Sequence, residues 1–165
     1  MMLCARPVNS DVRCFCLMRI GSDQSFVAFE FKEAMPEHLP GGTDIACSVS
    51  VSCDAFNGRV ESVWFSREDI NRFLLELRSL EEYRKGSANL VNLSSLSEYN
   101  PLRFEVFSID EVGHMAVRAD LLKVSYVGGG IHPLKVSVTF DMDAGDLPSM
   151  LVEFRKLFDF KRRRI

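Results

Sequence analysis

Residues 66–80, SREDINRFLLELRSL, have a helical pattern around which the rest of the chain is organised. The apolar residues of this stretch recur at intervals of three and four positions, which places them on one stripe of an amphipathic helix. These residues are Ile70, Phe73, Leu74, Leu77 and Leu80. The spacing predicts a helix that packs this stripe against a sheet or another helix and exposes its charged side to water.

The same stripe returns 77 positions further along the chain. Its members there are Leu147, Met150, Leu151, Phe154 and Leu157. Each predicted helix follows an alternating apolar strand, the first ending at Phe65 and the second at Phe140. We therefore expect one domain over residues 1–165, built from two copies of a strands-then-helix unit at about 12–83 and 102–160.

Strand signals fill the rest of both copies. Alternating or apolar runs predict strands at 12–20, 26–31, 47–55, 60–65, 104–109, 114–121, 122–126 and 134–140. Asn57-Gly58 predicts a type I′ turn between the third and fourth of these. Residues 32–44 and 84–101 are predicted loops, with a short strand around 90–93 as the alternative in the second. Short links favour antiparallel pairing, so the fold class is α+β, with about eight antiparallel strands and two helices.

The helix ends are marked by capping residues. Ser66, with Asp69 three positions on, is the expected N-cap of the first helix, which should end near Tyr83. Asp143 or Asp146 should cap the second helix, where Pro148 is tolerated because first-turn amides lack helical partners.

Composition restricts the class of protein. The chain has 47% hydrophobic and 26% charged residues, as soluble globular domains do. It has no apolar run of membrane-spanning length, no secretory signal pattern, and a net charge of −3 that gives no reason to expect nucleic acid. The five cysteines, Cys4, Cys14, Cys16, Cys47 and Cys53, are odd in number and form no CxxC pair. We interpret them as reduced, buried thiols, which predicts a cytoplasmic protein.

No motif announces a reaction, so we expect no catalytic, cofactor or metal site. Asp141, Asp143 and Asp146 could attract a cation, but they lack the spacing of a calcium loop, and helix capping accounts for them. His38, His114 and His132 are scattered, and only a distant pairing with Cys14 or Cys16 could make a nucleophile and base. Gly128-Gly129-Gly130 lies between strands, so it predicts a hairpin or bulge instead of a phosphate loop.

Two features could serve binding. Trp64 alternates with Val63 and Phe65 and is either a buried core residue or an exposed binding residue on the far sheet face. The tail Lys161–Arg164 could bind nucleic acid or acidic lipid, although four cations at a helix end are typical of a solvated terminus.

Several of these patterns resemble the WapI-type bacterial immunity proteins and their uncharacterised relatives, over most of residues 12–160. The resemblance is carried by Asp54-Ala55-Phe56-Asn57-Gly58, Val63-Trp64-Phe65, Asp69-Ile70-x-x-Phe73-x-x-x-Leu77-x-x-Leu80, and Phe140-x-x-Asp143 followed by Leu147, Leu151 and Leu157. It implies a cytoplasmic, non-catalytic protein that binds and blocks a cognate toxin domain. It supplies no site residues.

Two other functions stay open at this point. One is a homo-oligomeric structural or regulatory module, such as a homodimer, that uses an unpaired sheet edge. The other is a small enzyme with its site between the two repeats. For the immunity function, the acidic balance of the chain favours a basic partner such as a nuclease toxin.

Overall fold

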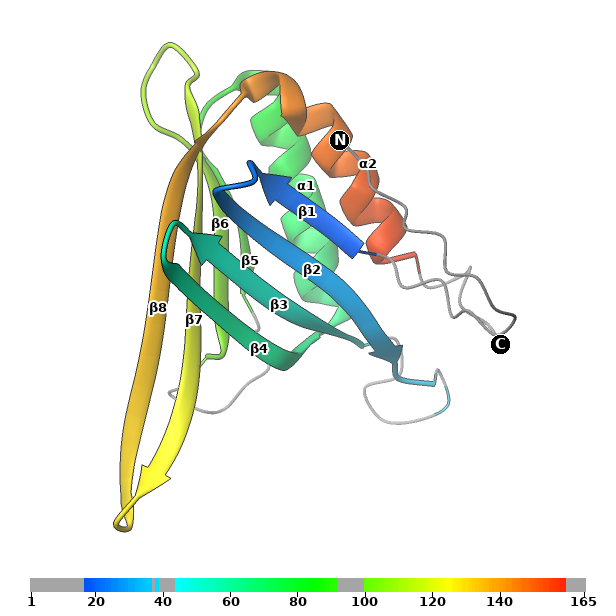
Figure 1. Cartoon of the computed structure of the whole chain (residues 1–165). Coiled ribbons are helices and arrows are strands. Elements are labelled where there is room, and N and C mark those ends of the chain that lie inside the picture. The colour runs from blue at the N-terminus through cyan, green and yellow to red at the C-terminus, as the bar shows by residue number, and fades with distance from the viewer. Residues whose placement is uncertain (1–16, 37, 39–43, 92–99, 160–165) are drawn as a thin grey trace, which may run out of the picture.

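The fold was analysed in a computed structural model that describes residues 17–36, 38, 44–91 and 100–159. Within these residues, eight strands and two helices follow one another in the order four strands, helix, four strands, helix (Figure 1). A short 3₁₀ turn, Ala144–Asp146, precedes the second helix. The elements are β1 (Leu17–Gly21), β2 (Ser25–Ala34), β3 (Ile45–Cys53), β4 (Phe56–Phe65), α1 (Arg67–Tyr83), β5 (Ser87–Val91), β6 (Leu102–Ser108), β7 (Met115–Val127), β8 (Gly130–Met142) and α2 (Leu147–Leu157).

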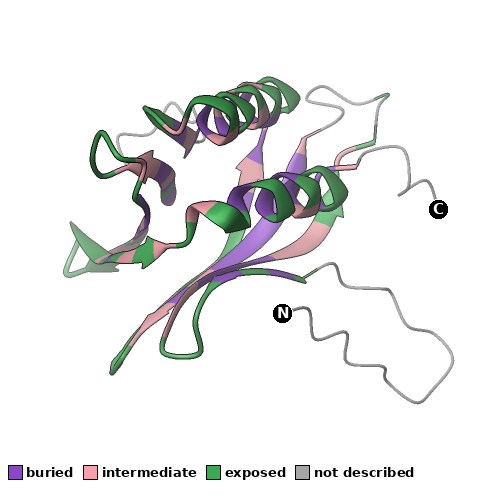
Figure 2. Cartoon of the chain, turned by 90° about the horizontal axis from the view of Figure 1, so that it is seen from above, coloured by how far each residue is buried: buried purple, intermediate pink, exposed green. Residues whose placement is uncertain are grey.

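The strands form two antiparallel sheets of four. Their orders are β1-β2-β3-β4 and β5-β6-β7-β8, so each sheet is a meander of sequence neighbours. Each sheet is followed directly by its helix, and Figure 2 shows both helices green on their outer sides and purple where they meet the strands. The predicted α+β class, with a duplicated strands-then-helix order, is confirmed.

The helices bury the stripes that the sequence predicts. Of the five predicted residues on α1, Ile70, Phe73, Leu77 and Leu80 are buried and Leu74 is half-buried, and all five predicted residues on α2 are buried. The Ser66 hydroxyl accepts a hydrogen bond from the Asp69 amide at 3.1 Å and donates one to the Asp69 carboxylate at 2.7 Å. Asp143 accepts from the Gly145 amide at 2.8 Å, so it caps the 3₁₀ turn that leads into α2.

The C-terminus of α1 differs from the usual glycine cap. Arg84 takes the left-handed conformation, with φ 57°, and its amide donates to the Leu80 carbonyl at 2.9 Å. A non-glycine residue is uncommon at such an angle. The Arg84 guanidinium donates to the Ala144 carbonyl, which ties the end of α1 to the turn before α2.

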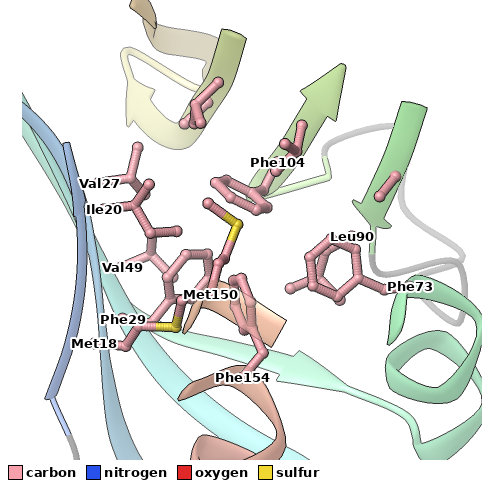
Figure 3. Packing of buried hydrophobic residues seen from close by; sticks show 14 of the residues in the cluster. Met18, Ile20, Val27, Phe29, Val49, Phe73, Leu90, Phe104, Met150 and Phe154 are labelled. Carbon is pink, nitrogen blue, oxygen red and sulfur yellow. The ribbon is translucent and has the colours of Figure 1, made fainter. Parts of the chain in front are cut away.

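One aromatic cluster joins both sheets and both helices in the core. The Phe154 ring on α2 lies 4.8 Å from Phe73 on α1, 5.3 Å from Phe29 on β2 and 5.8 Å from Phe104 on β6, measured between ring centroids (Figure 3). All four rings are fully buried. Edge-to-face pairs of this kind add stability beyond the apolar area that they remove from water.

The β3–β4 turn is not where the sequence placed it. The β3–β4 hairpin is present, but it turns at Asp54–Ala55, and Asp54 supplies the positive φ of 51°. Asn57 and Gly58 lie inside β4, opposite Ser52 and Val51. A Cβ atom on Gly58 would lie 3.3 Å from the Val136 side chain of the second sheet, so any larger residue there would require that side chain to shift.

The second sheet corrects two further predictions. Most of the short strand β5 falls outside the predicted 90–93 alternative, in a segment predicted to be loop. Residues 114–121 and 122–126, predicted as two strands, form the single 13-residue strand β7. Cys4, Cys14, Cys16, the predicted strand before Leu17 and the Lys161–Arg164 tail lie outside the described residues.

Replacing Phe154 with alanine tests the central cluster. We expect Phe154→Ala to lower the free energy of unfolding by about 3–5 kcal/mol, because it leaves a cavity where three other rings meet. The matched control is Phe56→Ala, since Phe56 is 74% exposed and should change stability by less than about 0.5 kcal/mol. Urea unfolding followed by circular dichroism measures both; equal effects would contradict the assignment.

Candidate interaction surface

The long β7–β8 hairpin extends beyond the rest of the second sheet (Figure 1). Its base is held where the Gly58 backbone approaches Leu121 and Val136; a Cβ atom on Gly58 would lie 3.4 Å and 3.3 Å from their side chains. Leu121 is buried and Val136 is half-buried. We call the part of the hairpin beyond this pair, residues 122–135, the arm.

The arm concentrates exposed apolar side chains. Tyr126 is 75% exposed, Val127 62%, Ile131 50% and Leu134 60%. Four of the eleven large apolar side chains that are strongly exposed in the described part of the chain thus fall within nine residues. Single exposed apolar residues are ordinary, whereas a cluster on one projecting element marks an interaction site.

The apolar residues change faces where the arm begins. Val117, Ala119 and Leu121 face the core and are buried, and the next apolar residues, Leu122 and Val124, point to the opposite face. This switch made β7 look like two strands in the sequence. It is the signal in the sequence that could have revealed the arm.

The register defines what each face of the arm carries. Paired residues share a face, so Tyr126 lies with Ile131, Val124 with Pro133, and Leu122 with Lys135. We call this the outer face; its first five members are apolar. The inner face pairs Lys123 with Leu134, Ser125 with His132 and Val127 with Gly130, so it is mixed.

A tight turn closes the arm. Gly128 and Gly129 have φ values of 59° and 80°, the two positive angles that a type I′ turn requires. The turn joins two strands and does not open a helix, which confirms the hairpin predicted for the triple glycine. Its twist matches that of the flanking strands, so the two faces of the arm are kept in register to the tip.

The outer face of the first sheet is a weaker candidate. Trp64 lies there, opposite Ala46, and is half-buried, between the two alternatives left open for it. Beside it Glu30 accepts a hydrogen bond from Ser48 at 3.1 Å and pairs with Lys32 at 3.0 Å and Arg59 at 3.2 Å. The contact with Lys32 holds the pKa of Glu30 below its usual value. These charges are already paired within the chain.

The groups considered for chemistry do not converge. His132 lies on the arm, His38 is exposed, and His114 is exposed on the β6–β7 turn. Cys47 is buried in the core, and Cys53 accepts a hydrogen bond from the Ser25 hydroxyl at 3.5 Å. No cluster of three metal-ligating side chains occurs within the described ranges. No helix in the described part of the chain is long and apolar enough to span a membrane.

An α+β scaffold with a protruding apolar hairpin therefore defines a candidate protein-binding surface. The comparisons with known proteins agree with the resemblance noted in the sequence: the chain belongs to the immunity protein WapI-like family, which it matches over residues 17–159. No curated protein sequence matches it. The solved structure "Crystal structures of trypanosoma bruciei MRP1/MRP2" is similar at a TM-score of 0.43 and 11% identity, over 90% of this chain and 86% of that one.

The His114–Asp110 pair gives a pH-dependent prediction. The His114 Nδ1 atom lies 2.5 Å from the Asp110 carboxylate, and this hydrogen bond raises the pKa of His114 above 6.5. A raised folded-state pKa stabilises the fold below the unfolded pKa, and this contribution is lost as the pH rises through the folded pKa. An NMR titration of the imidazole should therefore place the pKa above 6.5.

The control for this titration is Asp110→Asn. The asparagine oxygen can still accept the three amides, of Val112, Gly113 and His114, that Asp110 Oδ1 holds in the turn. The carboxylate charge is removed, so the pKa of His114 should fall toward its usual value. An unchanged pKa in this variant would show that Asp110 is not its cause.

Proposed function

We propose that this protein is a non-catalytic immunity protein that binds a cognate toxin domain and neutralises it stoichiometrically. The observation that carries the proposal is membership of the immunity protein WapI-like family over residues 17–159, a range that includes both sheets, both helices and the arm. The geometry adds a surface suited to protein binding.

The proposed mechanism needs no chemistry from this chain. The aromatic core joins both sheets and both helices, and the arm projects exposed apolar side chains from them. Such side chains can fill a groove on the toxin and keep substrate out. Aromatic and aliphatic anchors that become fully desolvated contribute most of the affinity of a typical protein interface.

We place this function in the bacterial cytoplasm, where an internalised toxin domain would act. The buried Cys47 fits a reducing compartment, because it packs in the core as a small apolar side chain. A tight complex formed there would block the toxin before it reaches its target.

A homo-oligomeric module is the second candidate. It is favoured by one observation: β8 is an edge strand of 13 residues, and an unpaired edge can add a strand from another copy. Light scattering separates the two candidates, because a strictly monomeric protein removes the oligomeric one.

The proposal is tested with the toxin domain encoded beside the gene. Cells that express this domain should stop growing, and co-expression of the wild-type chain should restore growth. The purified proteins should form a 1:1 complex on size-exclusion chromatography with light scattering. A non-cognate toxin domain is the control and should be neither bound nor neutralised.

Growth arrest that persists with abundant, folded wild-type protein, together with absence of a complex, would overturn the immunity function. Growth rescue without a complex would contradict stoichiometric binding and point to an indirect mechanism.

A further inference from the structure

We infer that the outer face of the arm is the docking surface, and that its occupant is an apolar groove bordered by carboxylates on a partner protein. The face consists of Leu122, Val124, Tyr126, Ile131 and Pro133, with Lys135 opposite Leu122 at its base. This inference rests on the proposed function, because it names the contact that the toxin domain would make.

The side chains of the arm, and not its strand edge, make the contact. β8 is the edge of its sheet, and strand addition would require a continuous row of backbone donors along it. Pro133 lies in the middle of the arm's edge and has no amide hydrogen, and the register shows no bulge around it. Proline on an edge strand is a recognised obstacle to edge pairing.

The charge of the arm selects the partner. From Leu121 to Phe140 the chain has Lys123 and Lys135 but no aspartate or glutamate. Lys135 is paired with Asp120 at 3.0 Å, so Lys123, on the inner face, is the cation of this segment without an ion pair among the described contacts, although the whole chain has a net charge of −3. The complementary surface is acidic, the opposite of the basic partner that the overall charge predicts. Two copies docked arm to arm would add a second Lys123 and no unpaired carboxylate of the arm to the contact, which disfavours a second copy as occupant.

The composition of the outer face favours protein over nucleic acid or membrane. Single-stranded nucleic acid binds to rows of aromatic platforms, and the face has one aromatic residue, Tyr126. Acidic membranes attract clusters of four to eight basic residues, whereas this segment has two lysines. Tyr126 can fill a pocket on a protein partner, and the aliphatic side chains around it would exclude water from the contact.

Two double variants of the arm separate its faces. Tyr126→Ser with Ile131→Ser removes the outer anchors, and Val127→Ser with Leu134→Ser removes two equally exposed apolar side chains from the inner face. Calorimetric titration with a catalytically inactive form of the toxin domain encoded beside the gene should show binding weakened by about 30-fold or more for the outer variant. The inner variant should lose less than about threefold.

The outcomes distinguish this inference from the proposed function. If the wild-type chain does not bind the toxin domain, the immunity function fails and the inference falls with it. If the wild-type chain binds but the outer variant binds equally well, the docking surface is wrong and the function stands. Equal losses of affinity in both variants would assign the contact to the whole tip and contradict a docking surface limited to the outer face. All proteins should have the same circular dichroism and melting temperature, because every replaced side chain is exposed.

The same set of proteins tests the other possible occupants of the outer face. Light scattering that shows a wild-type dimer lost in the outer variant would assign the face to a second copy and overturn the inference. Binding to single-stranded DNA, or to vesicles with anionic lipid, that is lost in the same variant would overturn it in favour of nucleic acid or membrane.

Charge reversal tests the acidic rim. Lys123 has no ion pair among the described contacts, so Lys123→Glu changes the arm without unpairing a carboxylate. We expect its association rate with the toxin domain to fall about tenfold at low salt, and the difference to shrink as salt is added. The matched control is Lys85→Glu. Lys85 lies near the β6–β7 turn, at the other end of β7, so this substitution should leave the association rate unchanged. A faster rate for Lys123→Glu would overturn the acidic partner.

Discussion

The packing of the Phe154 ring is the constraint on which the rest of the structure depends. This ring contacts Phe29 of the first sheet, Phe104 of the second and Phe73 of α1, so it holds both sheets and both helices to one another. Each sheet has four strands and one helix, and the buried residues of both units form one hydrophobic cluster. Sharing the aromatic cluster gives both units a common interior, which explains why each helix must present its apolar stripe inward.

Much of this architecture could be predicted because it follows from local patterns. The stripe that begins at Ile70 and the cap at Ser66 depend on residues close together in the chain, and both are confirmed. The β3–β4 turn could not be placed correctly, because Gly58 lies inside β4, close to the Val136 side chain of the other sheet, and takes no part in the turn. In the sequence, a glycine that lies against a distant strand cannot be distinguished from a glycine that forms a turn.

The arm was missed for a related reason. The alternation that predicts a strand assumes that one face meets the core, and β7 meets the core only as far as Leu121. Beyond that residue Leu122, Val124 and Tyr126 point to the opposite face, so the pattern seemed to end and restart. The cost of exposing Tyr126 and Ile131 to water has no compensation within the described part of the chain. A binding partner that covers the arm would remove it.

Hydrogen–deuterium exchange of the chain, alone and in complex with the toxin domain, tests this account most directly. Amide exchange reports which backbone segments are shielded or held closed by a partner. We predict slower amide exchange across residues 122–135 in the complex, and unchanged exchange rates in α1 and in the strands of the first sheet. Protection confined to the first sheet around Trp64, with the arm exchanging as in the free protein, would contradict it.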